Sequence, residues 1–199
     1  DTHALIDLGN AALCGMLILM FVHIYDGLRM QAHEELERLA QTDALTGVAN
    51  RGSFRHALQR SIQEAERSNG HLVLVLLDVD HFKQVNDQWG HEGGDMALQH
   101  ICQILQQRLR VTDLLGRLGG EEFGLLLRHT DSAGAGPLVE TLRRQIAEQP
   151  LDYDGEQIAL SATFGLAEWP LDGQTPDELY RCADRRLYQG KEQGRNQVV

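Results

Sequence analysis

Cysteine is scarce in this sequence, and neither its cysteines nor its histidines have the spacing of a common metal site. Its three cysteines, Cys14, Cys102 and Cys182, stand far apart and form no C-x-x-C pair, so neither a zinc site nor a disulfide framework is predicted. Its nine histidines include no H-E-x-x-H pair, which disfavours a histidine-based metal site. The scattered cysteines are typical of a protein from a reducing compartment.

Positive charge is also scarce. The chain has 18 Lys and Arg residues against 29 Asp and Glu, which gives a formal net charge of -11. A non-specific nucleic-acid binder needs a basic face to replace the counterions around phosphates, so we expect no nucleic-acid partner. An acidic protein can still bind a nucleoside triphosphate if a metal and a few local cations neutralise its phosphates. The charge balance therefore favours small ligands.

The first 25 residues differ from the rest of the chain in composition. Residues 11–25 carry no formal charge, and extending the segment back to Leu5 adds only Asp7 and Asn10. A membrane span needs about 20 mostly apolar residues, so this segment lies near the threshold. It lacks the basic start and the small-residue cleavage site of a secretory signal. We expect residues 1–25 to be an apolar helix that ends a transmembrane or sensor segment; the alternative is a buried or dimerising helix.

Residues 26–41 have the pattern of an amphipathic helix. Leu28, Ala32, Leu36 and Leu39 recur at spacings of four, four and three, so they share one face with charge opposite. The narrow stripe favours a short coiled-coil stalk between two domains, and a solvated surface helix is the alternative.

From Thr42 onward, apolar runs alternate with amphipathic segments, which predicts one α/β domain over residues 42–199. The run at 71–79 is almost continuously apolar, as expected for a strand covered on both faces. Thr175, Pro176 and Glu178 form a capping box that marks the start of the last helix. The other expected elements are helices at 52–67, 94–108 and 137–148, a hairpin at 114–127 and a strand at 157–169.

Two acidic clusters lie where predicted strands end or turn. Asp78 and Asp80 follow the buried strand, and Glu121 and Glu122 lie in the hairpin. Carboxylates that converge from separate strands can bind Mg²⁺, which prefers hard oxygen ligands and can activate a hydroxyl for attack on a phosphate. Either cluster alone is more typical of a solvated loop, because acidic residues are common in loops. Asp80 in particular could be a ligand or a structural residue.

The glycines before the second cluster sharpen this interpretation. Gly119 and Gly120 can adopt a positive φ and have no side chain, so a substrate could lie directly against the backbone. The alternative is an ordinary hairpin turn. A Gly-Gly pair followed at once by two acids is more than such a turn requires.

Five motifs together resemble the GGDEF family of diguanylate cyclases. They occur in the family's order from about Thr42 to Gln197 and comprise DALTGVANR (43–51), DVDHFKQVND (78–87), GHEGGD (90–95), GGEEF (119–123) and YQGKEQGRN (188–196). The resemblance implies a palm-like α+β fold similar to adenylyl cyclases and polymerase palms, with a central, mainly antiparallel five-stranded sheet flanked by helices and preceded by an N-terminal helical segment.

The activity implied by the resemblance is the condensation of two GTP molecules into cyclic di-GMP and two pyrophosphates by a homodimer. Mg²⁺ is the expected cofactor, with Mn²⁺ as an alternative. The resemblance further implies a cytoplasmic catalytic domain, and the apolar N-terminal segment suggests a tether to the bacterial inner membrane. The competing interpretation is a catalytically silent module that only senses GTP or binds cyclic di-GMP.

Catalytic and metal roles are transferred from the family motifs. Asp78, the carbonyl of Val79 and Glu121 correspond to the metal ligands. Glu121 is also the expected base, or metal-bound activator, for the ribose 3′-hydroxyl. Glu122 would support metal or substrate binding, and Lys83 would act at the phosphates.

Substrate-binding roles are transferred in the same way. Asn86 offers a donor and an acceptor and Asp95 offers acceptors, which suits the Watson–Crick edge of guanine. Lys83, Lys191 and Arg195 match the phosphate-binding positions, although each cation on its own would be read as a surface residue.

Arg110 and Asp113 match the R-x-x-D product-inhibition site of the family, five residues before the signature. Arg can bind guanine or phosphate through two hydrogen bonds and Asp can accept from guanine N–H groups. A helix-end salt bridge between the two residues is the alternative. One departure from the family pattern is Gly190, where alanine is usual; glycine there is expected to loosen the last helix by up to about 1 kcal/mol.

Overall fold

The computed structural model describes residues 15–26, 29–30 and 41–199, and it divides the chain into two units, residues 1–40 and 41–199. In the first unit, residues 15–26 are helical and their large apolar side chains are exposed. Among the described residues, no helix has both the length and the apolar character that a membrane crossing requires. The predicted apolar helix at 1–25 is thus described only in part, and the leucine stripe at 28–39 lies outside the described residues.

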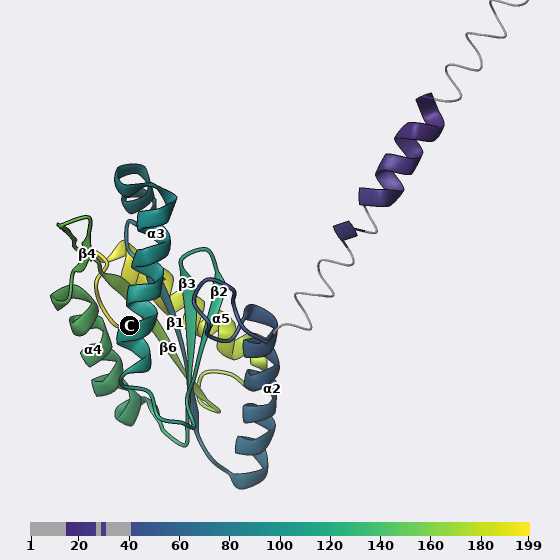
Figure 1. Cartoon of the computed structure of the whole chain (residues 1–199). Helices are drawn as coiled ribbons and strands as arrows, with labels where there is room; N and C mark the ends of the chain where they lie inside the picture. The colour runs from purple at the N-terminus through teal and green to yellow at the C-terminus, as the bar shows by residue number, and fades with distance from the viewer. Residues whose placement is uncertain (1–14, 27–28, 31–40) are drawn as a thin grey trace, which may run out of the picture. The chain divides into compact units, whose positions relative to one another are not determined.

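The second unit is built on an antiparallel sheet with the strand order β2-β3-β1-β6 (Figure 1). These strands span Leu114–Gly119 (β2), Glu122–Arg128 (β3), Leu72–Val79 (β1) and Ala162–Trp169 (β6). Strand β1 is central, and all eight of its residues are buried. This confirms the palm-like α+β fold that the sequence predicts.

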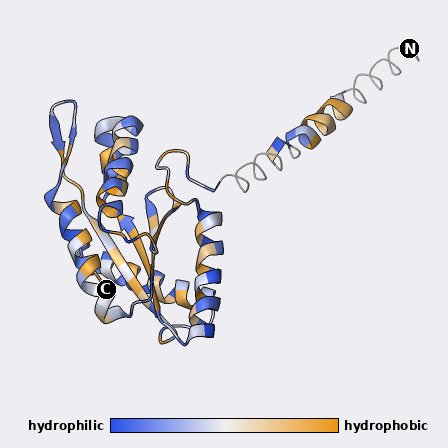
Figure 2. Ribbon diagram, turned by 60° about the horizontal axis from the view of Figure 1, so that its bottom comes forward, coloured by the Kyte–Doolittle hydropathy of each residue, from blue (hydrophilic) through white to orange (hydrophobic). Residues whose placement is uncertain are grey.

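Helices cover both faces of this sheet. Alternate residues of β1, beginning at Val73, pack with α3 (Phe82–Gln106) and α4 (Ser132–Glu148). The other set, beginning at Leu72, packs with α2 (Arg51–Ser68) and α5 (Pro176–Glu192). Figure 2 shows apolar strands enclosed by helices with hydrophilic outer sides. Two apolar layers thus explain the unbroken apolar run at 71–79.

The main sheet has four strands, so the prediction of five was wrong in this detail. The predicted strand at 157–169 divides: Glu156–Ile158 (β5) pairs with Leu151–Tyr153 (β4) in a separate hairpin, and only β6 joins the main sheet. Beside β6, the C-terminus forms a single parallel bridge between Phe164 and Val198. This bridge is too short to count as a fifth strand.

Two helices begin earlier than their apolar periodicity predicts. Helix α3 starts at Phe82 and continues to Gln106 through a kink at Gly90, whose φ is 71°. Helix α4 starts at Ser132, because the Asp131 side chain accepts a hydrogen bond from the Gly134 amide and caps the first turn. The predicted start of α5 is confirmed, since the Thr175 side chain accepts from the Glu178 amide.

A glycine pair on β2 and β3 fixes α2 against the hairpin. Gly116 and Gly124 are register partners, and a Cβ atom at either would lie 2.7 or 2.6 Å from the ring of Phe54. Phe54 is fully buried in the groove that these two glycines leave. Side-chain packing thus holds α2 directly on the strands that lead into and out of the GGEEF turn.

Gly190 lies where α5 meets β6 and leaves no room for a larger residue. A Cβ atom there would lie 2.6 Å from Cγ2 of Thr163. Helix propensity alone favours alanine by up to about 1 kcal/mol, but this contact opposes it. The glycine therefore accommodates Thr163, rather than simply loosening the helix.

We predict that Gly190→Ala lowers the free energy of unfolding by about 1–3 kcal/mol, because overpacking outweighs the gain in helix propensity. Denaturant unfolding monitored by circular dichroism measures this change. In a Thr163→Ser background, which removes Cγ2 and keeps the hydroxyl, Gly190→Ala should cost much less. An equally large loss in both backgrounds would contradict the steric explanation.

Candidate active site

The register of the sheet brings the two acidic clusters together at the end of the sheet where β1 ends and β3 begins. We call this end, with Asp78, Glu121 and Glu122, the acidic edge. Asp78, near the end of β1, lies opposite Glu122 at the start of β3 and opposite Thr163 on β6. The Val79 amide donates a hydrogen bond to the Glu121 carbonyl over 3.2 Å. Residues more than 40 positions apart in sequence are therefore held together by backbone pairing.

Asp78 is a buried carboxylate with a lysine partner. Its exposed fraction is 9%, and its Oδ2 lies 2.9 Å from Nζ of Lys191 at the end of α5. Burial raises the pKa of Asp78 above its ordinary value, and the charges of Glu121 and Glu122 raise it further, while Lys191 opposes the shift. The site therefore concentrates negative charge around one buried carboxylate that a single cation partly neutralises.

This donor set suits a metal that also binds a phosphate. Within the described residues, no three His, Cys, Asp or Glu side chains group closely enough to hold a metal ion. The predicted ligands are the two carboxylates of Asp78 and Glu121 with the Val79 carbonyl, all hard oxygen donors. Mg²⁺ is commonly bound by one or two carboxylates together with substrate phosphate oxygens. The residues fit such an ion, provided that the substrate supplies the remaining ligands.

Asp80, left open by the sequence, is committed to the fold. Its exposed fraction is 6%, and its two oxygens accept hydrogen bonds from the Ser161 hydroxyl (2.8 Å), the Thr163 hydroxyl (2.6 Å) and the Asn196 amide (3.0 Å). A carboxylate that accepts three hydrogen bonds has little capacity left for a metal. Asp80 therefore connects β6 and the C-terminal segment to the end of β1.

The predicted guanine-reading residues Asn86 and Asp95 lie on either side of the kink in α3, and the predicted phosphate-binding Lys83 lies on the same helix. Lys83 and Asn86 precede Gly90, and Asp95 follows it. A Cβ atom at Gly94 would collide with Oδ1 of Asn86, so this glycine permits the Asn86 side chain to lie against the next turn of the helix. Lys83 and Asp95 are exposed and Asn86 is half-buried. The kink thus brings the Asn86 side chain against Gly94, the residue before Asp95.

The Gly-Gly turn is held by a residue that the sequence did not single out. Arg117 donates to the Gly120 carbonyl through Nη2 (2.8 Å) and Nε (3.1 Å), and its Nη1 lies 3.2 Å from Oδ1 of Asp43. Asp43 opens the DALTG segment, so the motif itself was visible but its partner was not. Neither Gly119 nor Gly120 has the positive φ that the sequence suggested. At Gly120 an added Cβ would meet open space, so the pair leaves the backbone uncovered.

Lys191 and Arg195 come from the end of α5 and the segment after it. Lys191 pairs with Asp78, as described above. Arg195 is exposed, has a left-handed backbone with φ 62°, and its amide donates to the Gly190 carbonyl. Both residues therefore lie within five positions of Asn196, whose amide donates to Asp80.

Arg110 and Asp113 lie away from the GGEEF turn, at the beginning of β2. Asp113 accepts from the Arg110 amide (2.9 Å) and from the Arg128 amide (3.4 Å). The carboxylate thus stabilises a tight turn, and within the described residues no salt bridge joins it to the Arg110 guanidinium. Nearby Arg128 has a buried Nε without a hydrogen-bond partner among those residues. The turn presents an exposed arginine beside further polar groups.

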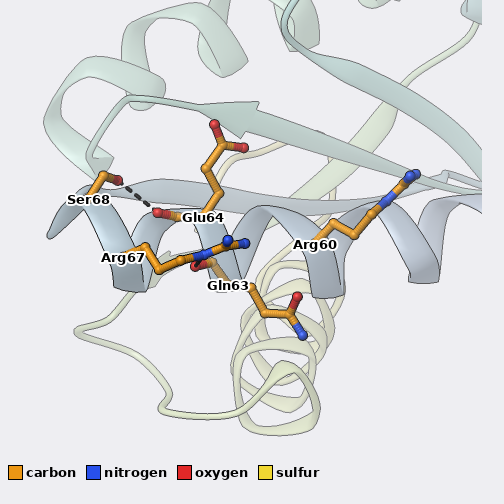
Figure 3. Close-up of a pocket in the computed structure, with 5 residues that line it drawn as sticks. All are labelled: Arg60, Gln63, Glu64, Arg67 and Ser68. Carbon is orange, nitrogen blue, oxygen red and sulfur yellow. Dashed lines mark hydrogen bonds between the residues drawn. The ribbon is translucent and has the colours of Figure 1, made fainter.

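A surface hollow on α2 contains none of the predicted site residues. It is lined by Arg60, Gln63, Glu64, Arg67 and Ser68 (Figure 3). Arg67 and Ser68 donate hydrogen bonds to the carbonyls of Gln63 and Glu64, respectively. The hollow is therefore a feature of the helix surface and not of the acidic edge of the sheet.

An antiparallel sheet covered by helices, with acidic residues at the ends of two adjacent strands, places the chain in the palm-like α+β class of domains. Within this class, the family model described as "Diguanylate cyclase, GGDEF domain" matches residues 40–197. The chain belongs to the GGDEF domain family of diguanylate cyclases.

Individual relatives agree with this assignment. The chain is 35% identical over 188 residues to the probable diguanylate cyclase DgcT of Escherichia coli, covering 92% of this chain and 40% of that protein. It is 39% identical over 166 residues to the bifunctional diguanylate cyclase/cyclic di-GMP phosphodiesterase MucR of Pseudomonas aeruginosa, covering 83% of this chain and 24% of MucR. The chain thus spans less than half the length of these two relatives.

Solved structures show the same fold. The GGDEF domain of DgcB from Caulobacter crescentus, in complex with c-di-GMP, superposes with a TM-score of 0.77 at 31% identity. The match covers 80% of this chain and 92% of the DgcB domain.

The ion pair between Arg117 and Asp43 affects stability at acid pH. The pKa of Asp43 is lowered: burial raises it, but hydrogen bonds from Thr46 and the hydrogen bond and charge of Arg117 outweigh burial. A carboxylate with a lowered pKa stabilises the fold above its unfolded-state pKa, and this contribution is lost as pH falls through the folded-state pKa. Arg117→Met should raise the Asp43 pKa, so that acid destabilisation begins at a higher pH.

NMR titration of the Asp43 carboxyl carbon and acid unfolding curves test this prediction. In an Asp43→Asn background, which has no titrating group at this position, Arg117→Met should no longer shift the acid transition. An Asp43 pKa that is the same with and without Arg117 would contradict this role of the ion pair.

Proposed function

We propose that the chain is the catalytic domain of a diguanylate cyclase, which condenses two GTP molecules into cyclic di-GMP and two pyrophosphates. The observation that carries this proposal is the pairing of β1 with β3. It puts Asp78 opposite Glu122, and the Val79 amide donates a hydrogen bond to the Glu121 carbonyl. Membership of the GGDEF family supports the choice of reaction. The acidic edge of the sheet is the centre at which the phosphate chemistry would take place.

In the proposed reaction, the 3′-hydroxyl oxygen of one GTP attacks the α-phosphorus of the other. A new P–O bond forms, the bond between the α-phosphorus and the bridging oxygen to the β-phosphate breaks, and pyrophosphate leaves; a second attack closes the ring. Glu121 accepts the proton of the 3′-hydroxyl, and Glu122 adds negative charge beside it. Bound Mg²⁺, or Mn²⁺, held by Asp78, the Val79 carbonyl and Glu121 would stabilise the charge on the phosphates.

Substrate binding is assigned to groups on α3 and on the segment that ends α5. Asn86 and Asp95 read the edge of guanine, since Asp95 accepts from its N–H groups and Asn86 can both donate and accept. Lys83, Lys191 and Arg195 neutralise the triphosphate. Nζ of Lys191 forms an ion pair with Asp78, and we propose that the same ammonium group also binds a phosphate of GTP. Gly119 and Gly120 allow the nucleotide to lie against bare backbone.

Two domains are needed for one product molecule. Each acidic edge would bind one GTP, so two chains must face each other as a homodimer before either 3′-hydroxyl can reach the other α-phosphate. We propose that the segment at 26–41 promotes this dimer, because its sequence predicts a helix with a leucine stripe suited to self-association. The apolar segment at 1–25 would hold the domain at the cytoplasmic side of the bacterial inner membrane.

The direct test is to incubate the purified protein with GTP and Mg²⁺ and separate the nucleotides by chromatography. We expect cyclic di-GMP from the native chain. Glu121→Gln should lower the rate by at least about a hundredfold, because the base and a metal ligand are lost together, while GTP binding persists. A native protein that forms no cyclic di-GMP while its product is continuously removed would contradict the enzyme proposal. If that protein still bound GTP or cyclic di-GMP, the silent binding module would be the correct alternative.

We further propose that cyclic di-GMP inhibits the enzyme at the turn formed by Arg110 and Asp113. Support comes from the exposed Arg110 guanidinium and from the fixed position of the Asp113 carboxylate beside it. Because this turn lies at the far end of β2 from the GGEEF motif, a product bound there would act without competing directly for the GTP site.

Arg110→Ala should raise the cyclic di-GMP concentration for half-inhibition by about tenfold or more, because bonds from a charged guanidinium are lost. Initial rates measured against added cyclic di-GMP give this concentration. Arg108→Ala is the matched control, since Arg108 is an exposed arginine of the same loop. Equal sensitivity to the product in native and Arg110→Ala proteins would place the inhibitory site elsewhere.

A further inference from the structure

The segment that carries Arg195 has an unusual backbone. Gly194, Arg195 and Asn196 have φ values of 113°, 62° and 45°, so three successive residues lie in the left-handed region. Glycine adopts this region freely and asparagine tolerates it, but an arginine residue is strained there. Such a conformation persists only when surrounding contacts impose it.

Backbone contacts of Asn196 supply part of the restraint. Its amide donates to Oδ2 of Asp80 (3.0 Å) and approaches Oγ1 of Thr163 (3.1 Å). The neighbouring Arg195 amide and Gln197 side chain both donate to the Gly190 carbonyl, at 3.0 and 2.7 Å. These bonds fix the backbone of the segment against the end of β1 and α5.

The Asn196 side chain has a separate partner on α4. Nη1 of Arg143 donates to its Oδ1 over 2.8 Å. The same guanidinium donates to the Glu140 carboxylate through Nε (2.9 Å) and Nη2 (2.6 Å), which fixes its plane. Although it is charged, the Arg143 side chain is only 18% exposed. Arg143 thus clamps the strained segment from a helix that carries none of the predicted site residues.

We propose that Arg143 is a positioning residue for the triphosphate of the bound nucleotide. It does not touch the nucleotide; it restrains Asn196 and thereby the adjacent Arg195, whose exposed side chain is assigned to the phosphates. This inference rests on the proposed function, because it requires GTP to bind at the acidic edge. It assigns to α4 a role in substrate affinity that none of the five sequence motifs contains.

The neighbouring Arg144 provides a matched control on the same helix. Its Nε lies 3.9 Å from Glu148, both side chains are well exposed, and it makes no contact with the C-terminal segment among the described residues. Arg143→Gln and Arg144→Gln remove the same charge from adjacent positions. Only the first removes the hydrogen bond to Asn196, so the comparison separates this contact from the net charge; Asn196→Ala separates it from the hydrogen bonds of Arg143 to Glu140.

Calorimetric titration with the uncleavable analogue guanosine 5′-[α,β-methylene]triphosphate and, separately, with guanosine tests the proposal. For Arg143→Gln we expect the dissociation constant of the analogue to rise about fivefold to tenfold, with guanosine affinity unchanged. Arg144→Gln should match the native protein for both ligands. Asn196→Ala removes the acceptor of the same hydrogen bond and should also weaken analogue binding. Combining Arg143→Gln with Asn196→Ala should weaken binding no further than either substitution alone.

Three results would overturn the proposal. Native affinity for the analogue in both Arg143→Gln and Asn196→Ala would show that the clamp does not position the phosphates. Equal weakening of guanosine and the analogue would indicate a general structural role. In both cases, cyclic di-GMP synthesis by the native protein would leave the proposed function standing. Failure of the native protein to bind the analogue or to convert GTP would overturn both proposals together.

Discussion

The pairing of β1 with β3 and β6 is the constraint on which the rest of the site depends. It sets Asp78 opposite Glu122 on one side and Thr163 on the other. A shift of one residue in either register would move every side chain of β1 to the other face, so the apolar layers on both faces also fix the acidic edge. The Gly116–Gly124 groove and Phe54 lock the hairpin that carries the second cluster. The core and the site therefore specify one another.

Charge at that edge is balanced through groups far apart in sequence. Lys191 partly neutralises the buried Asp78. The segment after α5 is held at Asn196, whose amide donates to Asp80 and whose side chain accepts from Arg143 on α4. Arg117 holds the Gly-Gly turn to Asp43 on the opposite flank. If the proposed function holds, a nucleotide would meet a site in which Lys191 and the turn after Arg117 are already held in place, which reduces the ordering that binding must supply.

The resemblance to the GGDEF family predicted the fold class. Local periodicity predicted the buried strand at 71–79, and capping chemistry predicted the start of α5. The strand count was wrong because the sequence does not show which neighbour β5 pairs with. The family motifs point to Asp78 and Glu121, whose roles stay predictions. They do not point to Arg117 or Arg143, whose hydrogen bonds to Asp43 and Asn196 join residues far apart in sequence. Asp80 could be interpreted only once its three donors were known. Gly119 and Gly120 could have adopted a positive φ but do not, and an added Cβ atom at Gly120 would meet open space.

The central claim is that each chain supplies half of a catalytic unit. Its most direct test is to hold the native protein at a fixed concentration and add increasing amounts of the Glu121→Gln chain, allowing the dimers to exchange. We predict that cyclic di-GMP formed per native chain falls as mixed pairs replace native pairs, because the linking attack and the ring-closing attack each need an intact acidic edge. A rate that stays constant at a large excess of the variant, with mixed dimers demonstrated, would contradict it.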